Sequence, residues 1–344
     1  MRVPTRYLAG AFVTVGALAL TTWTAPWTSD GDPGVEATVV VTLADDRIDE
    51  SSGLVVRGDS LFTVNDSGDG PFVFEVDART GETTGVTTYD AQDPVDVEAV
   101  APGPGGTLWV GDIGDNGRSR GAISVHELIP RLGGGTVDAT TYDLSYPDHP
   151  HDAEALLVHP RTGRVVVVTK QVLVGGTVFA APARLREGAV HRLREVGRVP
   201  GLVTDGTFLP DGKHILLRTY GNAAVYTYPG LEEVASFALP RQEQGEAVAV
   251  APGRGGGLWV YLTSEGTGSD VLALDLPDLT PSPTVEPSPT TAPTPTTAPQ
   301  NDPAEATDRR RPGRPPGYAV AAVLGAVVVG LLVRASRRRS RRTR

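Results

Sequence analysis

The chain has 344 residues, no cysteine and a formal net charge of −10. The absence of cysteine excludes disulfide bonds, thiolate metal sites and cysteine nucleophiles, so stability must come from core packing. Residues 35–278 hold 35 acidic and 18 basic residues, a net charge of −17, while eleven arginines follow residue 308. Such an acidic segment repels phosphate backbones, which argues against nucleic-acid binding and favours a cation or a cationic partner.

The N-terminus has the features of an export signal. Two arginines lie within residues 1–6, and an apolar stretch follows from Tyr7 to Leu20. Ala17-Leu18-Ala19 is a small-x-small cleavage sequence, although it comes early and without a polar run before it. Residues 1–25 are therefore expected to be either a signal peptide or an uncleaved signal anchor.

Five segments in the middle of the chain repeat one pattern, in which a polar or acidic residue opens an apolar run of β type. They begin at Ser52, Glu98, Glu154, Thr204 and Glu246, at intervals of 46, 56, 50 and 42 residues. A turn and a second β-rich run follow each of them. Repeats of about 40–50 residues with several short strands are typical of propeller blades. Residues 35–278 are therefore predicted to form an all-β β-propeller of about five blades.

The strands of these blades can be assigned from alternation and turns. Second strands are expected at 61–66, 108–112, 165–170, 215–220 and 258–264, and further strands at 72–76, 83–88, 123–127, 142–146 and 271–276. The last unit lacks an outer strand, which residues 37–43 can supply, so that the N-terminal strand closes the ring and removes its exposed edges. The long second unit is also compatible with six blades, and a two-sheet sandwich is the alternative architecture.

The C-terminal fifth of the chain is predicted to be a stalk, an anchor and a tail. Residues 279–316 are rich in proline and threonine, a composition that favours an extended polyproline-like stalk. Residues 317–333 carry no charge and are just long enough for a single transmembrane helix. The arginine-rich residues 334–344 are expected to stay in the cytoplasm. The chain is thus predicted to be a single-pass protein of the cell membrane with an extracellular propeller.

The repeat also predicts where functional side chains gather. In a propeller the innermost strand of each blade starts at one face of the central channel, and the loop after the second strand returns to that face. Carboxylates at these two places converge on one channel mouth, and oxygen ligands of this kind prefer a hard cation such as Ca²⁺. The predicted cation ligands are Asp66, Asp69, Glu98, Asp112, Asp115, Glu154 and Glu246.

Other polar residues of the same loops are candidates for binding and catalysis. Asn65, Asn116, Lys170, Arg218 and Tyr220 are the predicted ligand-binding residues, and His151, Lys170 and Arg218 are the catalytic candidates. The common catalytic motifs of hydrolases, metalloproteases and nucleotide-binding proteins are missing from the sequence. An alternative role exists for each acidic residue, since aspartate often caps turns and a glutamate at a strand start can hydrogen-bond the neighbouring blade.

Several short strings resemble a widespread bacterial family of exported β-propellers, loosely described as WD40-like or phytase-like. These strings are Ser51-Ser-Gly-Leu54, Asn65-Asp-Ser-Gly-Asp69, Gly111-Asp-Ile-Gly-Asp-Asn116, His151-Asp-Ala-Glu-Ala-Leu156, Leu217-Arg-Thr-Tyr220 and Gln244-Gly-Glu-Ala247. The resemblance covers about residues 48–276 and implies the propeller fold. Metal-dependent phytase and lactonase propellers are distant analogies, and their catalytic residues do not transfer. Ser52 and Thr204 replace the repeated glutamate, so a site built on that column is asymmetric.

Three functions fit these features. The first is a surface-anchored module that binds an extracellular small molecule, glycan or protein, with a calcium-type ion at the channel mouth. The second is a metal-dependent hydrolase of a phosphate ester or lactone, in which carboxylates hold the ion and Lys170, Arg218 or His151 stabilises charge. The third is a structural protein of the cell envelope.

Overall fold

In the computed structural model, the described residues are Asp32 and residues 34–66, 69–91, 94–171, 175–253 and 256–279. They belong to one compact unit, Met1–Thr284. The predicted signal segment 1–25, the stalk after residue 279, the transmembrane helix 317–333 and the basic tail 334–344 lie outside the described residues. Within the described ranges, no helix has the length and apolar character needed to cross a bilayer.

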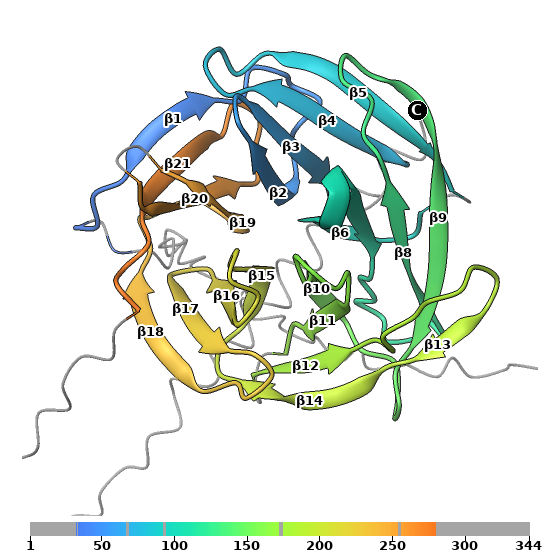
Figure 1. Ribbon diagram of the computed structural model, residues 1–344. Helices are drawn as coiled ribbons and strands as arrows, with labels where there is room; N and C mark the ends of the chain where they lie inside the picture. The colour runs from blue at the N-terminus through green and yellow to red at the C-terminus, as the bar shows by residue number, and fades with distance from the viewer. Residues whose placement is uncertain are drawn as a thin grey trace, which may run out of the picture. The chain divides into compact units, whose positions relative to one another are not determined.

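The architecture is all-β, as predicted, and of propeller type: five four-stranded antiparallel units surround a common axis (Figure 1). The units are β2 (Ser51–Arg57), β3 (Ser60–Asn65), β4 (Phe72–Asp77) and β5 (Thr83–Asp90); β6 (Val97–Pro102), β7 (Leu108–Asp112), β8 (Ile123–Leu128) and β9 (Gly135–Ser145); β10 (Ala153–Val158), β11 (Val165–Thr169), β12 (Gly176–Ala180) and β14 (Arg194–Val199); β15 (Val203–Phe208), β16 (His214–Thr219), β17 (Asn222–Thr227) and β18 (Glu233–Ala238); and β19 (Gly245–Pro252), β20 (Leu258–Ser264), β21 (Asp270–Asp275) and β1 (Thr38–Thr42). A short strand, β13 (Val190–Arg192), lies outside this scheme.

The innermost strands form the centre of the core. Every residue of β10 and β15 is buried, whereas the outer strand β18 has no buried residue. Small residues allow neighbouring inner strands to pack closely: a Cβ on Gly53 of β2 would lie 2.3 Å from the amide nitrogen of Val100 in β6. Any side chain at this position would therefore push two neighbouring units apart.

The N-terminal strand closes the ring. β1 pairs antiparallel with β21, with Thr38 opposite Ala273 and Val41 opposite Val271. Val41 and Leu43 are buried in the core of this last unit. The first and last parts of the described chain thus share one sheet, which joins the two ends of the ring.

The long second unit does not contain an additional blade in the part of the chain that the structure describes. Its outer strand β9 has 11 residues and pairs in two directions. Residues 135–138 pair parallel with β5 of the first unit, and the following residues pair antiparallel with β8. β13 adds a further parallel pairing at the end of β9. The extra residues of this unit therefore pair its outer strand β9 with β5 of the first unit and with β13.

Candidate functional site

The repeated position is the second residue of the innermost strand in all five units. The pairing of that strand with its neighbour shifts register at this residue in every unit, between Ser51 and Gly53, Val97 and Ala99, Ala153 and Ala155, Val203 and Asp205, and Gly245 and Val248. Such bulges re-aim side chains. Because neighbouring inner strands contact one another around the axis, the bulges bring Glu98, Glu154 and Glu246 within electrostatic reach of their neighbours.

The two units without glutamate use this position to tie the ring together. The hydroxyl of Ser52 donates a hydrogen bond to the carbonyl oxygen of Glu98 at 2.7 Å, and the hydroxyl of Thr204 donates to the carbonyl oxygen of Glu246 at 3.0 Å. Each bond links one inner strand to the next. The carboxylates of this column are therefore confined to three units, and the site is asymmetric.

A second column of equivalent positions follows the second strand of each unit. The same backbone bond recurs in four units: the amides of Asp66, Gly114, Lys170 and Glu265 donate to the carbonyls of Glu50, Asp96, Asp152 and Gln244 at 2.8, 3.1, 2.9 and 2.9 Å. Tyr220 follows β16 in the corresponding place of the remaining unit. Glu265 was not among the predicted site residues, although its place directly after the expected strand 258–264 was a usable signal.

Three buried carboxylates form what we call the axial carboxylate cluster: Asp66, Asp96 and Glu98. Their ligand atoms lie within 4.8 Å of one another, and the residues are 3%, 5% and 0% exposed. Neither carboxylate oxygen of Glu98 has a hydrogen-bond partner among the described residues. Burial, together with the charges of Glu154 and Asp96, raises the pKa of Glu98 well above its usual value. A buried carboxylate in this position requires a proton or a cation.

Gly114 leaves the room that this cluster occupies. A Cβ at this position would lie 2.4 Å from Glu98 Oε1 and 2.6 Å from Asp96 Oδ2. Other units place a side chain at this second-column position, such as Asp66 or Lys170. The second unit has only Gly114 there. Asn116, a predicted ligand-binding residue, reaches Asp96 Oδ2 through its amide nitrogen at 3.5 Å.

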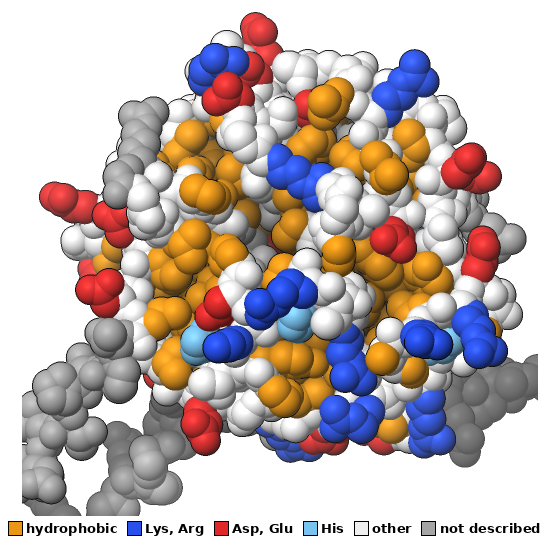
Figure 2. All heavy atoms as spheres, in the orientation of Figure 1, with side chains coloured by type: hydrophobic (Ala, Val, Ile, Leu, Met, Phe, Trp, Pro, Cys, Tyr) orange, Lys and Arg blue, Asp and Glu red, His pale blue; other side chains and the backbone are white. Residues whose placement is uncertain are grey.

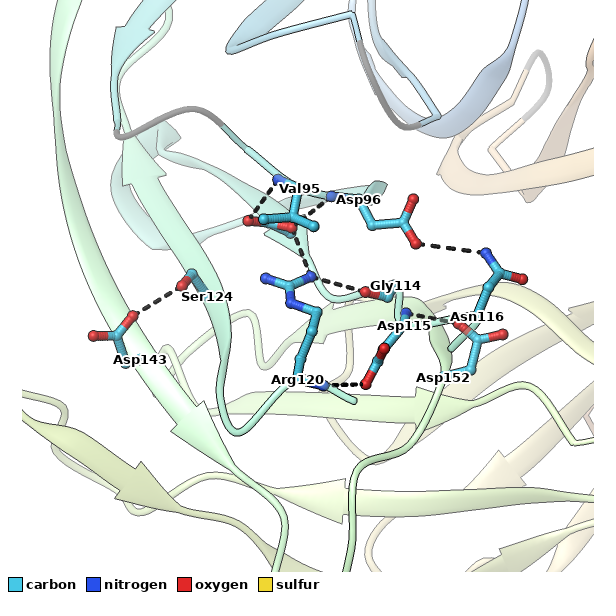
Figure 3. A network of polar contacts seen from close by, with 10 residues as sticks. Val95, Asp96, Gly114, Asp115, Asn116, Arg120, Ser124, Asp143 and Asp152 are labelled. Atoms are coloured by element: carbon cyan, nitrogen blue, oxygen red, sulfur yellow. Dashed lines mark hydrogen bonds and ion pairs between the residues drawn. The ribbon is translucent and has the colours of Figure 1, made fainter. Parts of the chain in front are cut away.

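Two predicted cation ligands, Asp112 and Asp115, lie outside the cluster and are held by Arg120 (Figure 3). The guanidinium of Arg120 lies 2.8 Å from Asp112 Oδ1 and donates to the carbonyl of Gly114, also at 2.8 Å. Its backbone amide donates to Asp115 Oδ2 at 2.7 Å, and Asp112 also accepts the amide of Asp96 at 2.9 Å. These two carboxylates shape the loop that presents Gly114.

Lys170 lies among the remaining glutamates of the first column. Its ammonium nitrogen is 3.1 Å from Glu154 Oε1 and 5.6 Å from the ring centre of Tyr220, whose hydroxyl donates to Glu246 Oε1 at 3.3 Å. Burial disfavours the ammonium, but Glu154 and Glu246 outweigh it and hold the pKa of Lys170 well above its usual value. The lysine is therefore charged and compensates Glu154, whereas Glu98 has no such direct donor among the described residues.

Two further acids of this region have pKa values near neutrality. Burial and the neighbouring Glu154 raise the pKa of Asp152 to about 6, although its carboxylate accepts the amide of Asp115 at 2.9 Å. Burial and the charge of Glu246 raise the pKa of Glu265 to about 8. Both groups can change charge at physiological pH.

Arg218 is placed inside the strand pairing and not on an open surface. It is 0% exposed, and its guanidinium donates to the carbonyls of Ala247 and Thr263 and to the side chain of Gln242. Burial lowers its pKa to about 10. Asp205 lies nearby, also buried, and accepts the amide of Val248 at 2.7 Å. This pair braces the inner strands of the fourth and fifth units.

The remaining predicted residues also lie outside the axial carboxylate cluster. Asn65 donates to the carbonyl of Arg47 at 2.6 Å and to the carboxylate of Asp69. His151 is buried, with its Nε2 atom 3.0 Å from Asp148 Oδ1.

The face of the molecule drawn in Figure 1 is not acidic at its centre. Figure 2 shows hydrophobic side chains gathered over this face with lysine and arginine side chains among them, while acidic side chains lie mainly towards the rim. The carboxylates of the axial cluster are 5% exposed or less. The negative charge of the site is therefore an internal property and not an acidic patch on this face.

The sequence matches no protein-family model and no curated protein. Among solved structures, hydrazine synthase from Kuenenia stuttgartiensis is 16% identical with a TM-score of 0.36, and the match covers 63% of this chain and 56% of that one. A luciferin-regenerating enzyme is 11% identical (TM-score 0.39, 70% and 78% covered), and a gluconolactonase from Xanthomonas campestris is 14% identical (TM-score 0.39, 72% and 97% covered). With identities of 11–16% and TM-scores of 0.36–0.39, no conclusion about fold or activity is drawn from these similarities.

Proposed function

We propose that this protein is a surface-displayed propeller module that binds a calcium-type cation in the axial carboxylate cluster and an extracellular ligand next to it. The observation that carries the proposal is the carboxylate of Glu98, which is completely buried, has no hydrogen-bond partner among the described residues and lies beside Asp66 and Asp96. A bound cation compensates this charge. Three carboxylates are the donor set of a hard, oxygen-preferring ion.

The surroundings support the same assignment. Gly114 presents no side chain to the cluster, and Lys170 is already paired with Glu154, so neither supplies a competing positive group to Glu98. Asp66, Asp96 and Glu98 would hold the ion, and the ion would attract oxygen atoms of a carboxylate, phosphate or glycan ligand. In this proposal residues 1–25 direct export, 279–316 form the spacer and 317–333 anchor the module in the membrane.

The first test is thermal unfolding of the purified protein in calcium and in EDTA. Binding at about 100 times Kd stabilises a folded protein by about 2.7 kcal/mol. For a domain of this size that corresponds to a rise in Tm of about 5–10 °C. Glu98→Gln is expected to remove most of this rise and to increase stability in EDTA, because a buried carboxyl with a raised pKa costs stability at neutral pH and a glutamine does not.

The matched control is Glu75→Gln. Glu75 is also a buried carboxylate, but it accepts hydrogen bonds from Ser60 and from the amide of Gly133. This variant should keep the full calcium response. If wild type shows no shift at millimolar calcium, or if Glu98→Gln responds as wild type does, the cation site is refuted.

The alternative function, hydrolysis of a phosphate ester or lactone, is favoured by one observation. Asp152, with a pKa of about 6, lies within electrostatic reach of Glu98, Glu154 and the ammonium of Lys170. A group of this pKa is suited to act as a general base near neutral pH. Calcium-dependent turnover of a nitrophenyl phosphate or a lactone that Asp152→Asn abolishes would establish the enzyme. Calcium-dependent ligand capture without turnover would establish the binding module.

A further inference from the structure

A second group of metal-binding side chains lies away from the axial cluster, in the segment between β9 and β10. Ligand atoms of Asp148, His149 and His151 lie within 4.8 Å of one another. The Nε2 atom of His151 is 3.0 Å from Asp148 Oδ1, and the Nε2 atom of His149 is 3.6 Å from Asp148 Oδ2. The side chains of Asp148 and His149 are 49% and 64% exposed, so solvent reaches the group, while that of His151 is 7% exposed.

The hydrogen bonds of His149 leave its outer nitrogen available. Its Nδ1 atom lies 3.0 Å from the carbonyl oxygen of Pro150. A carbonyl only accepts hydrogen bonds, so Nδ1 carries the proton and the neutral ring keeps a lone pair on Nε2. A backbone carbonyl on the far ring nitrogen is the usual way in which proteins orient a metal-binding imidazole.

His151 can adopt the same tautomer and keep its hydrogen bond to Gln171, while its Nε2 contact with Asp148 Oδ1 is given up for a metal ligand. Its Nδ1 atom faces the side-chain amide of Gln171 at 3.2 Å, and that amide also lies 3.1 Å from the hydroxyl of Thr169. If the amide turns over, its oxygen accepts both from Nδ1–H and from the Thr169 hydroxyl, whose oxygen already accepts the amide of Thr177 at 2.9 Å. Nε2 is then free to bind a metal.

The backbone holds the group in place. Pro147 and Pro150 flank Asp148 and His149, and their rings fix φ and restrict the residue before Pro150. The guanidinium of Arg192 donates to the carbonyl of Pro147, and the ring of His151 packs against Tyr146 and Phe179 at centroid distances of 4.8 and 5.2 Å. In a tetrahedral site with bonds of about 2.0–2.1 Å, ligand atoms are about 3.3 Å apart. The distance of 3.0 Å between His151 Nε2 and Asp148 Oδ1 is close to that value.

We propose that Asp148, His149 and His151 bind a transition-metal ion, Zn²⁺ or Cu²⁺ in preference to Ca²⁺. Two imidazole nitrogens and one carboxylate oxygen suit borderline divalent ions, whereas calcium prefers oxygen ligands alone. The fourth position faces solvent. The site is independent of the axial carboxylate cluster.

The test is calorimetric titration of the EDTA-stripped full chain, free of any affinity tag, with ZnCl₂ at pH 7.5. All proteins carry Glu98→Gln, so that the axial cluster contributes no binding. We expect one Zn²⁺ per chain, and His149→Ala should weaken it by about tenfold or more. The control is His214→Ala, because His214 is also paired with a carboxylate, Asp211 at 2.6 Å, and is not among the described groups of three or more metal-binding residues. This control should bind as the parent does.

Two further measurements separate a metal site from a folding effect. The electron paramagnetic resonance spectrum of bound Cu²⁺ should show two coupled nitrogens, and one after His149→Ala. Gln171→Glu should tighten Zn²⁺ binding, since a carboxylate can only accept from Nδ1–H and so favours the metal-binding tautomer of His151. Equal zinc affinity in the parent and in His149→Ala, or no binding at about 100 µM free zinc, would overturn the proposal.

Discussion

Replacing Asp152 by asparagine should stabilise the protein at neutral pH and leave its stability in acid unchanged. The carboxyl is surrounded by negative charge, and its pKa is about 6 in the folded protein against 3.8 for an unperturbed aspartate. Asparagine has nearly the same shape, and its side-chain oxygen can still accept the amide of Asp115 that now donates to Asp152 at 2.9 Å. The substitution therefore removes the charge and keeps the bond.

The expected size and sign follow from linkage. Below pH 3.8 the carboxyl is protonated in both states and adds no pH dependence. As pH rises through the folded pKa, ionisation remains more favourable in the unfolded chain, so wild type loses stability between pH 3.8 and about 6 and then levels off. A difference of about two pKa units corresponds to about 3 kcal/mol, or about 6–12 °C in Tm for a domain of this size.

The assay is urea denaturation of wild type and Asp152→Asn in EDTA at several pH values from 4 to 8. The free-energy difference between them should be small at pH 4 and reach about 3 kcal/mol above pH 6. Asp59→Asn is the control, because the Asp59 side chain is 70% exposed and its loss changes the net charge by the same amount. A difference for Asp152→Asn that does not vary with pH would refute the assignment of this carboxyl.

Three other substitutions test the ring and the site. Gly114→Ala should lower the free energy of unfolding by about 1–3 kcal/mol and abolish the calcium response, because its methyl group would lie 2.4 Å from Glu98 Oε1; an unchanged calcium shift in Tm would contradict this. Arg218→Ala should cost about 3–5 kcal/mol in denaturant unfolding, since it leaves buried carbonyls unpaired; a stable variant that has lost only ligand binding would instead make Arg218 a site residue. Leu43→Ala should cost about 2–4 kcal/mol in the same assay, because Leu43 is 2% exposed in the closing unit; a neutral result would show that the N-terminal strand contributes little to ring stability.

The architecture could be predicted well from local sequence. Alternating apolar residues and turn residues mark most strands of the first two units, and the repeat interval indicates about five units, with six left open by the long second unit. The N-terminal run at 37–43 was expected to pair with the last unit, and β1 does pair with β21. The double pairing of β9 was not predicted, because its residues 135–138 contact a strand 48 positions earlier, and nothing in their own sequence encodes that partner.

The convergence of acidic residues was also predictable, but not which carboxylates would lack a partner. Asp66 and Glu98 were among the predicted cation ligands and lie together, whereas Asp112 and Asp115 are held by Arg120, which carried no sequence signal.

By itself the sequence determined the all-β repeat, because strand periodicity depends only on which side chains are buried away from water. It also determined the end of the ring at which acidic residues gather, because these residues recur at the same place in the repeat. Only the tertiary structure decided the charge state of the site. The bulges at the repeated position, the loop that presents Gly114 and the pairing of Lys170 with Glu154 determine which carboxylates have a donor within a few ångströms. That depends on the closure of the whole ring, since electrostatic compensation acts between groups that are near in space and distant in sequence.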